Sequence, residues 1–437
     1  MPPLRVLICG GGIAGPALAF WLTRIGHSCT IIERFPSLRT NGQQIDIRDQ
    51  GIDVAKRMGL LEEIRKLIID EKGLQFVDNK GKQKAMFPKV KSNTGQQGFT
   101  TEFEMMRGDL CKLLADVTKD KTEYRFGVSV DEFKNEADHV KVKLSDGRVE
   151  TYDILVGADG QGSRTRKMVL QGEDSENLCL RKLGLYIAFY TLPREPEDTS
   201  LGTVYHAPGQ RVMITRWRSK MLGQGYLATM AHADELEQVL KQDVTKQRDL
   251  FGRIFQDAGW QADRLIEAMY ESEDFYAQSI VQLQSKIWSK GRVVLLGDAG
   301  YCPSPLTGMG TSLALVGAYV LAGEISKNQN NLDMAFKEYD KTLRPLVDRA
   351  HKLPPGVPGI VYPKSESAIK ILHWVLGLMT IFKTWIDLAF QYLIIPMEEQ
   401  WKLPDYPELK VEKTPSREQI CHQEQYHREQ YYQEQYH

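Results

Sequence analysis

The stretch from Leu4 to Arg34, LRVLICGGGIAGPALAFWLTRIGHSCTIIER, limits what this chain can fold into more than any other. It opens with an apolar run, passes through a glycine-rich turn into a run with helical periodicity, and closes on a second apolar run. This order predicts a strand, a helix and a second strand, the βαβ unit that binds dinucleotides. The alternative is a tight turn that binds nothing, but the acidic residue that ends the second strand favours a bound nucleotide.

Each glycine of the turn has a separate physical task. Gly10 makes the tight turn off the strand, Gly12 lets a pyrophosphate approach the backbone, and Gly15 lets the helix pack closely on the strand. The helix that opens at Ile13 points free N–H groups and the positive end of its dipole at that pyrophosphate. Glu33 is placed to accept hydrogen bonds from ribose hydroxyls. The face of the helix that we expect to be buried carries Ala14, Leu18, Trp21, Leu22 and Ile25.

The composition of the chain excludes several classes of protein. With 437 residues, of which 42% are hydrophobic, it can build two or three lobes around sizeable cores. Its formal net charge of -1 provides no field for nucleic acid or for an anionic membrane, so we expect neither as a partner. The expected partner is a small-molecule substrate, and the expected state of the chain is a monomer or a homodimer.

Cysteine usage and the N-terminus indicate a cytoplasmic protein. The six cysteines contain no CxxC pair and no regular spacing, which predicts reduced structural thiols instead of a disulfide scaffold or a zinc site. We therefore expect no bound metal. The first strand begins within a few residues of Met1, which leaves no room for a signal or transit peptide.

Patterns further along the chain predict a nucleotide-binding domain that a second domain interrupts. Leu74–Val77 is strand-like and lies where the chain leaves the first domain. From Leu183 to about Gln284, long apolar and aromatic runs predict a sheet domain. Arg292–Ala299 then returns to a buried parallel-type strand, and a helix is expected over Thr311–Ile325. The expected parts are 1–72, 102–180 and 287–350 for the nucleotide-binding domain, 73–101 and 181–286 for the substrate domain, 351–405 for C-terminal helices and 406–437 for a tail.

Three local patterns complete the expected elements. Helical periodicity runs from Val54 to Leu67, and a further helix is expected to start at Glu104. The alternating runs Tyr124–Val128 and Val140–Leu144 predict a hairpin-like pair of strands.

The strongly apolar segment from Ala368 to Ile395 raises the question of a membrane span. Charged residues and a histidine interrupt it, so no uncharged run approaches the roughly eighteen residues that a span needs. We expect buried or interface-facing helices there instead of membrane association. The C-terminal end repeats Glu-Gln-Tyr with a period that matches no helix face, and a polar tail without a core is expected to be disordered.

Two further loops repeat the combination of an apolar strand, an acid and glycines. One contains Asp159-Gly160 with Ser163 and Arg166, and the other contains Gly297-Asp298 followed by Gly308-Met309-Gly310. Loops at the ends of strands are where open α/β sheets bind ligands. The three loops are therefore expected to share one cofactor.

This set of three loops resembles the para-hydroxybenzoate hydroxylase-like, or group A, flavin-dependent monooxygenases. Within them it is similar to the branch that acts on polyketides and other polycyclic aromatics, which includes tetracycline-inactivating monooxygenases. The resemblance covers about Leu4 to Ala350. It implies an α/β fold in which a Rossmann-like FAD-binding domain is interleaved with a mostly antiparallel β-sheet substrate domain, followed by C-terminal helices.

The resemblance also implies which residues contact FAD. Arg34 would lie against the adenosine, Arg107 would contact the cofactor, and Asp298 would hydrogen-bond the ribityl chain. Backbone N–H groups from Gly308 to Thr311 would reach the flavin pyrimidine edge, where a helix N-terminus stabilises the anionic reduced flavin. The implied cofactor-binding residues are Gly10, Gly12, Ile13, Ala14, Gly15, Glu33, Arg34, Arg107, Asp159, Asp298, Gly308, Gly310 and Thr311.

Two of these positions carry alternatives, and a neighbouring residue departs from the family pattern. Asp159 either supports the cofactor and the approach of NAD(P)H or caps its own loop. Arg107 alone would be a surface ion-pair partner, and only its place in the motif favours a cofactor contact. Met309 stands where many relatives have Gln, a departure that leaves the backbone contacts intact.

The resemblance implies that NAD(P)H, bound only transiently, reduces FAD, and that O2 then forms a flavin C4a-hydroperoxide whose distal oxygen goes to an electron-rich ring or alkene. The expected activity is hydroxylation or epoxidation of an aromatic or polycyclic molecule, in secondary metabolism or in the degradation of aromatics. No side chain is assigned as a catalytic residue. The alternative is a flavoprotein of this fold that catalyses a non-redox cyclisation, or only binds, with structural FAD. A flavin halogenase ranks lower because the chain lacks a Trp-x-Trp-x-Ile-Pro motif.

A substrate pocket is expected between the flavin and the inner face of the sheet domain. In the strand around Arg211 alternate side chains share a face, so Arg211 and Met213 point one way and Arg216 the other. A short match of Gly209–Met213 to the tetracycline-modifying relatives favours the Arg211 face as the pocket face. The alternative is that Arg211 is a solvent-exposed strand arginine.

Overall fold

The computed structural model describes residues 2–89, 102–170, 180–381 and 401–410, and the first apolar run forms the inner strand β1 (Arg5–Cys9) of a six-stranded sheet. The strand order is β17-β18-β11-β1-β2-β7, and β1 pairs in parallel with both β2 and β11. The other strands are β2 (Ser28–Glu33), β7 (Thr122–Phe126), β11 (Ile154–Gly157), β17 (Ser289–Lys290) and β18 (Val293–Leu295).

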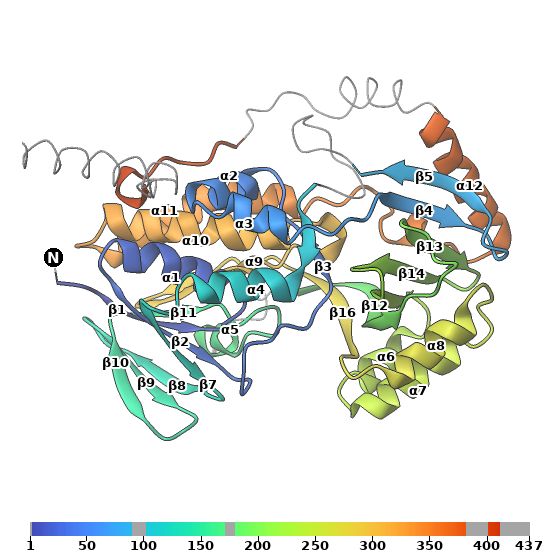
Figure 1. Cartoon of the computed structure of the whole chain (residues 1–437). Helices are drawn as coiled ribbons and strands as arrows, with labels where there is room; N and C mark the ends of the chain where they lie inside the picture. The colour runs from blue at the N-terminus through green and yellow to red at the C-terminus, as the bar shows by residue number, and fades with distance from the viewer. Residues whose placement is uncertain (1, 90–101, 171–179, 382–400, 411–437) are drawn as a thin grey trace, which may run out of the picture.

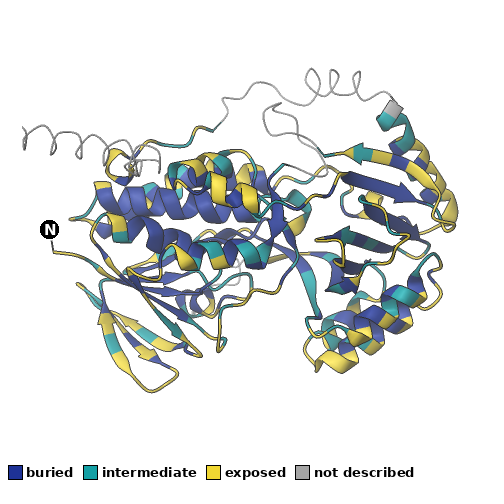
Figure 2. Ribbon diagram, in the orientation of Figure 1, coloured by how far each residue is buried: buried dark blue, intermediate teal, exposed yellow. Residues whose placement is uncertain are grey.

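Both faces of this sheet are covered, which explains why its strands are continuous apolar runs. Val6 and Ile8 face the larger core, where the helices pack, whereas Leu7 and Cys9 face a second core on the opposite side. Figure 1 shows the helices stacked over the sheet, and Figure 2 shows that α10 is buried along most of its length. The helices of this layer are α1 (Ala14–Arg24), α2 (Gln50–Arg57), α3 (Leu61–Lys66), α4 (Arg107–Asp116), α10 (Gly310–Lys327) and α11 (Leu332–Ala350).

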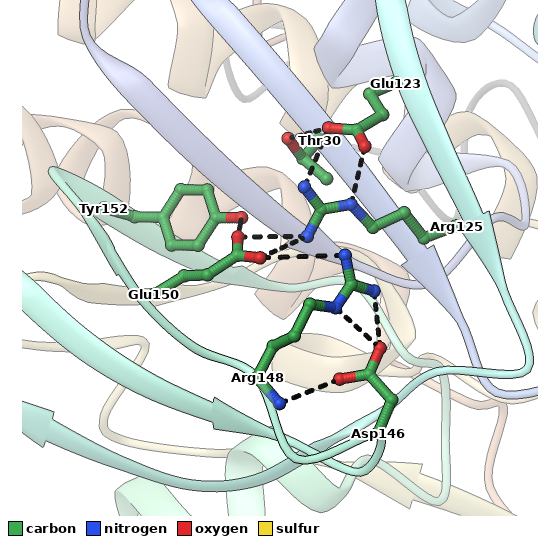
Figure 3. A network of polar contacts seen from close by, with 7 residues as sticks. All are labelled: Thr30, Glu123, Arg125, Asp146, Arg148, Glu150 and Tyr152. Atoms are coloured by element: carbon green, nitrogen blue, oxygen red, sulfur yellow. Dashed lines mark hydrogen bonds and ion pairs between the residues drawn. The ribbon is translucent and has the colours of Figure 1, made fainter.

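A three-stranded antiparallel sheet covers the other face of the parallel sheet, together with α5 (Arg164–Val169). Its order is β10-β9-β8, with β8 (Val130–Asn135), β9 (Val140–Leu144) and β10 (Val149–Tyr152). Arg125 on β7 donates to both carboxylate oxygens of Glu150 on β10, at 2.9 and 3.0 Å, and so ties the two sheets together at the surface (Figure 3).

The second lobe is built on a seven-stranded sheet in the order β16-β12-β15-β14-β13-β4-β5. Its pairs are antiparallel except for β13 with β4. One face packs on helices α6 (Ala233–Val239), α7 (Val244–Phe255) and α8 (Ala262–Glu271). The strands are β4 (Gly73–Val77), β5 (Gln83–Pro88), β12 (Leu180–Pro193), β13 (Gly202–Ala207), β14 (Arg211–Trp217), β15 (Leu222–Thr229) and β16 (Tyr276–Leu283).

A two-stranded ribbon, β3 (Gln44–Asp46) with β6 (Glu104–Met106), belongs to neither large sheet. In Figure 1, β3 lies between the two lobes. Polar side chains of this ribbon therefore lie where the first lobe meets the second sheet. The remaining helical elements are α9 (Asp298–Tyr301), α12 (Glu366–Ile381) and the 3-10 turns Pro305–Thr307, Gly359–Val361 and Pro407–Leu409.

The expected fold class is confirmed, and three local expectations are corrected. Tyr124–Val128 and Val140–Leu144 do not pair with each other: β7 adds in parallel to β2, and β9 lies between β8 and β10. An alternating pattern fixes which face of a strand is buried but not which strand it pairs with. Glu104 lies in β6, and the helix begins only at Arg107. The helix expected over Val54–Leu67 is divided at Gly59, whose φ of +74° ends α2.

The C-terminal expectations are tested only in part. The apolar segment forms α12 as far as Ile381, and this helix packs on the second sheet while Ile371 and Trp374 stay exposed. Among the described residues no helix is both long and apolar enough to cross a bilayer. The continuation to Ile395 and the residues after Lys410 lie outside the described residues. Four cysteines are buried free thiols, namely Cys9, Cys29, Cys111 and Cys302, whereas Cys179 and Cys421 lie outside the described residues.

Candidate functional site

A cavity of about 770 Å³ lies where the carboxyl ends of β1, β2 and β11 meet the ribbon and the second sheet. Its wall contains the glycine-rich turn at one end and side chains of β14 and β16 at the other. Of the residues expected to hold a cofactor, only Gly15 does not line it. The sequence-predicted residues are thus brought together around one space.

The glycine-rich turn has the geometry that its sequence requires. Gly10 has φ of +116°, and a Cβ atom there would lie 2.4 Å from the carbonyl oxygen of Ala158. A Cβ on Gly15 would lie 2.1 Å from the carbonyl oxygen of Gly10, so only glycine lets α1 sit this close to β1. Gly12 faces Arg107, whose Nη2 atom would be 3.1 Å from a Cβ at that position. Arg107 therefore lies directly over the turn.

Glu33 is fixed at the end of β2 by two backbone amides. Its Oε2 atom accepts a hydrogen bond from the N–H of Gly11 at 2.9 Å, and its Oε1 atom accepts one from Phe35 at 3.1 Å. A carboxylate has about four acceptor positions, so the two that remain can take ribose hydroxyls. The anchoring keeps the charge at the mouth of the turn.

Three arginines make this end of the cavity positive, which suits a pyrophosphate. The guanidinium groups of Arg34 and Arg39 lie over the ring of Phe35, at 4.9 and 4.6 Å from its centroid. Burial lowers the pKa of Arg39, and the nearby charge of Arg107 lowers it further. The sequence reasoning missed Arg39, because a single arginine in an irregular loop has no spacing that marks it.

Asp159 caps its loop, which is one of the two alternatives left open by the sequence. Its carboxylate accepts hydrogen bonds from the Ser163 hydroxyl at 2.5 Å, from the Arg164 N–H at 2.8 Å and from the Thr165 N–H at 3.1 Å. These groups are at the start of α5. Asp159 also lines the cavity, so its capping role fixes the shape of that wall.

Asp298 and the start of α10 form a further part of the cavity wall. Burial raises the pKa of Asp298, and the charge of Arg107 opposes that shift. Gly308 has φ of +63° and leads into α10, whose first residues Gly310 and Thr311 line the cavity. The free N–H groups of this helix end are therefore at the cavity wall. Met309 packs against the larger core instead, so its difference from Gln stays away from the cavity.

The expectation that the Arg211 face lines the substrate pocket is wrong. Arg211 donates to the carbonyl oxygen of Ile254 at 2.7 Å and pairs with Asp257, both on the side of the sheet that α7 covers. Met213 packs in the same core as α7 and α8. The opposite face of β14 reaches the cavity through Arg216, because alternate side chains of one strand point to opposite faces.

The sheet end of the cavity is polar and aromatic. Tyr276 and Gln278 of β16 line it, and the Tyr276 hydroxyl donates to the side chain of Gln43. Arg216 of β14 and Glu104 of β6 form an ion pair in the same wall. The sequence reasoning missed all of these residues, because it placed Glu104 in a helix and Arg216 on the outer face. The alternation along β14 was the available signal, but it does not say which face is covered by helices.

Comparison with known proteins shows the family to which a chain with these features belongs. A family described as "FAD binding domain" matches residues 3–349. The FAD-dependent monooxygenase asL4 of Sarocladium schorii is 39% identical, over 94% of this chain and 99% of the relative. The crystal structure of the tetracycline destructase Tet(51) has a TM-score of 0.72 and 30% identity, covering 93% of this chain and 100% of that chain. The structure of HpxO from Klebsiella pneumoniae, complexed with FAD and uric acid, has a TM-score of 0.68 at 20% identity, covering 89% of this chain and 96% of that chain, and supports the fold alone.

The residues around the cavity fit FAD. Gly10 and Gly12 leave the wall of the turn without side chains, the anchored Glu33 can accept from ribose hydroxyls, and arginines stand beside the turn. In the same wall, the N-terminus of α10 offers backbone N–H groups beside Asp298. These groups are acceptors for sugar hydroxyls and donors for phosphate and for an electron-rich ring edge, which are the groups that a flavin dinucleotide presents.

Proposed function

Because this chain belongs to the FAD-binding-domain family of flavin-dependent monooxygenases, we propose that it uses NAD(P)H and O2 to hydroxylate or epoxidise an aromatic or polycyclic small molecule. The observation that carries the proposal is a single cavity that runs from the glycine-rich turn to the face of the second sheet. One end fits the dinucleotide, and the other provides a wall of mixed polar and aromatic side chains for a second molecule.

Bound FAD supplies the redox chemistry, since it can accept a hydride from NAD(P)H and then react with O2. The protein's own residues bind and orient. Glu33 and Arg34 would hold the adenosine end, Arg107 lies over the turn, and the N-terminus of α10 would face the flavin with Asp298 beside it. The sequence holds no second glycine fingerprint, which favours transient binding of the nicotinamide cofactor.

The name of one structural neighbour favours a polycyclic substrate. Tet(51) is a tetracycline destructase, and it is 30% identical to this chain. Tyr276 and Gln278 in the cavity wall offer ring stacking and hydrogen bonding to such a molecule.

The proposal is tested by an absorption spectrum of the purified protein, followed by NADPH and NADH oxidation with phenols, anthraquinones and indoles. We expect flavin absorbance, substrate-stimulated NAD(P)H oxidation and one labelled oxygen atom from 18O2 in the product. Product formed without NAD(P)H or O2 would support the non-redox alternative. A protein that neither contains nor binds flavin would contradict both.

A further inference from the structure

Five charged side chains form a buried cluster where the ribbon meets the second sheet. We call it the cavity cluster: Asp46, Arg48, Glu71, Glu104 and Arg216. Their side chains are between 2% and 16% exposed, and all but Glu71 line the cavity. The sequence alone does not predict that these side chains meet, because they come from four separate segments of the chain.

The contacts within the cavity cluster are specific. Arg216 donates through Nε to both carboxylate oxygens of Glu71, at 2.8 and 3.1 Å, and its Nη2 pairs with Glu104. The backbone N–H of Trp217 gives Glu71 a further hydrogen bond at 3.1 Å. Arg48 donates through Nε to Asp46 at 3.0 Å. Glu71 is thus fully occupied by its partners, whereas Glu104 faces the cavity.

The cavity cluster has one carboxylate more than it has guanidinium groups. Asp46 and Glu104 are directly opposite each other in the β3–β6 register, an arrangement that is unfavourable when both are charged. Burial raises the pKa of Glu104 to about 7, and the negative charges of Asp46 and Glu71 add to the increase. The positive charge of Arg216 lowers the pKa but does not cancel the effect of burial. A proton on Glu104 would remove the unbalanced charge.

The same face of the ribbon carries an unsatisfied polar side chain. Gln44 lies two residues before Asp46 on β3, so its side chain shares the face of Asp46. Its side chain lines the cavity and is about nine-tenths buried, yet neither its amide nitrogen nor its amide oxygen has a hydrogen-bond partner among the described residues. A buried amide without partners costs free energy, which indicates that a polar ligand group completes this wall.

We propose that Glu104 is the catalytic base that takes the proton from an acidic hydroxyl, a phenol or an enol, of the substrate. This rests on the proposed function, since the cavity must hold the substrate. In the step, the O–H bond of the substrate breaks and a new O–H bond forms on the Glu104 carboxylate. The electron pair stays on the substrate oxygen and enters the ring or alkene that is to be oxygenated, and no redox change occurs.

The surroundings of Glu104 favour this transfer. Once Glu104 carries the proton, two carboxylates face two guanidinium groups and the cavity cluster is neutral. The new negative charge is then on the substrate, where Arg48 and the Gln44 amide can stabilise it. The charged and titratable groups that face Glu104 are Asp46 of β3, Glu71 before β4, Arg216 of β14 and Tyr226 of β15, and Arg48 lines the same cavity while it pairs with Asp46.

The first test follows proton movement without turnover. The FAD-loaded protein is mixed at pH 8, without NAD(P)H, with a hydroxyanthraquinone whose phenolate absorbs at longer wavelength than oxidised flavin. The spectrum reports ionisation of the probe, and calorimetry in two buffers of different ionisation enthalpy reports proton release. In the wild type we expect phenolate with no proton released to the buffer, because Glu104 accepts it.

The decisive comparison uses Glu104→Gln, which keeps the shape of the side chain and balances the cavity cluster at two charges of each sign. This variant should leave the probe as phenol, or release one proton for each phenolate formed. The matched control is Glu123→Gln, in a surface network of the same composition (Figure 3), which should behave as the wild type. Equal spectra and equal proton release in the wild type and Glu104→Gln would overturn the proposal.

A second measurement keeps the test valid if Glu104→Gln does not fold. Infrared difference spectra of the wild type should gain a carboxylic acid C=O band when the probe binds at pH 8, and no such band would also overturn the proposal. With a true substrate, the acidic limb of the kcat/KM profile should titrate near pH 7 in the wild type. It should be lost in Glu104→Gln, together with roughly 10²- to 10⁴-fold of the rate. The proposed function fails separately, if no flavin binds or no NAD(P)H is consumed.

Discussion

Two clusters in this molecule contain the same charged groups, three carboxylates and two guanidiniums, in different surroundings. One is the cavity cluster around Glu104 and Arg216. The other, which we call the surface network, ties the three-stranded sheet to β7 and is drawn in Figure 3. The surface network consists of Glu123, Arg125, Asp146, Arg148 and Glu150. Because the groups are equal in kind and number, the comparison isolates the effect of burial.

In the surface network every carboxyl group is held ionised. Hydrogen bonds from the two arginines lower the pKa values of Glu123 and Asp146. Burial alone would raise the pKa of Glu150, but hydrogen bonds from Tyr152 and the nearer arginine outweigh it. The side chain of Glu123 is 54% exposed, so water also solvates the charge.

In the cavity cluster the same excess of one carboxylate has the opposite result. The side chains of Glu71 and Glu104 are only 2% and 6% exposed, so the cost of desolvating Glu104 exceeds what the charge of Arg216 returns, and the pKa of Glu104 increases. The comparison shows that the number of ion pairs in a cluster does not determine which of its carboxyl groups are protonated. The solvent exposure of the third carboxylate decides whether a cluster only ties elements together or can exchange a proton.

The largest expected difference between the clusters comes from removing their central arginines. Arg216→Met leaves Glu71 and Glu104 buried without a counter-ion, and we expect a loss of about 3–5 kcal/mol in the free energy of unfolding. Arg125→Met acts on partly exposed partners and should cost about 1 kcal/mol or less. Urea denaturation at pH 8 in excess FAD measures both, and equal losses would break the comparison.

The second prediction concerns the sign of the pH dependence. The folded-state pKa of Glu104, about 7, is above its unfolded value, so the wild type should lose stability as the pH rises from about 4.3 to 7. Glu104→Gln removes that loss and should be more stable than the wild type at pH 8 by an amount on the order of 3 kcal/mol, with little difference at pH 4.

Glu123→Gln should have the opposite sign. The folded-state pKa of Glu123 is lowered, so its contribution is present above the unfolded value and is lost as the pH falls through the folded one. Because the group is largely exposed, we expect this variant to be less stable than the wild type at pH 8 by only about 0.5 kcal/mol. Urea unfolding of both variants at pH 4 and 8 checks the two signs together.

A third prediction concerns Glu33, whose carboxylate is held by backbone amides and not by arginines. Glu33→Ala should weaken FAD binding by about 1.5–3 kcal/mol, since ribose hydroxyls lose a charged acceptor. Fluorescence titration with FAD measures the change. An unchanged affinity would mean that Glu33 only shapes the turn through Gly11 and Phe35.

The smallest effect is expected at Arg211, which begins β14, in contrast to Arg216 near the other end of the same strand. Arg211 is bound on the helix-covered face by Asp257 and the carbonyl oxygen of Ile254. Arg211→Ala should therefore leave KM, coupling and FAD affinity nearly unchanged, within about twofold or roughly 0.4 kcal/mol, because Arg211 does not line the cavity. Release of hydrogen peroxide during NAD(P)H oxidation would show that Arg211 reaches the substrate after all.

The residues that the sequence assigned to the cofactor line one cavity, apart from Gly15, whereas Arg211, assigned to the substrate pocket, does not, and the difference has a physical reason. The turn at Gly10, the helix after it and Glu33 are close in sequence, so local spacing determines their geometry. The cavity cluster is non-local: Glu71, Glu104 and Arg216 meet only because the ribbon lies against the second sheet. Neither the partner of a strand nor the covered face of β14 can be read from alternation alone.

The measurement that tests the central claim most directly is a carboxyl titration by NMR. The FAD-loaded protein is labelled with 13C at the glutamate carboxyl carbons and titrated from about pH 3 to 9, a range that extends below the usual glutamate pKa, with Glu104→Gln and Glu123→Gln for assignment. We expect one resonance, absent from Glu104→Gln, to titrate near pH 7, and the Glu123 resonance to titrate below the usual range of a glutamate. A Glu104 resonance that titrates below pH 5 would contradict the account.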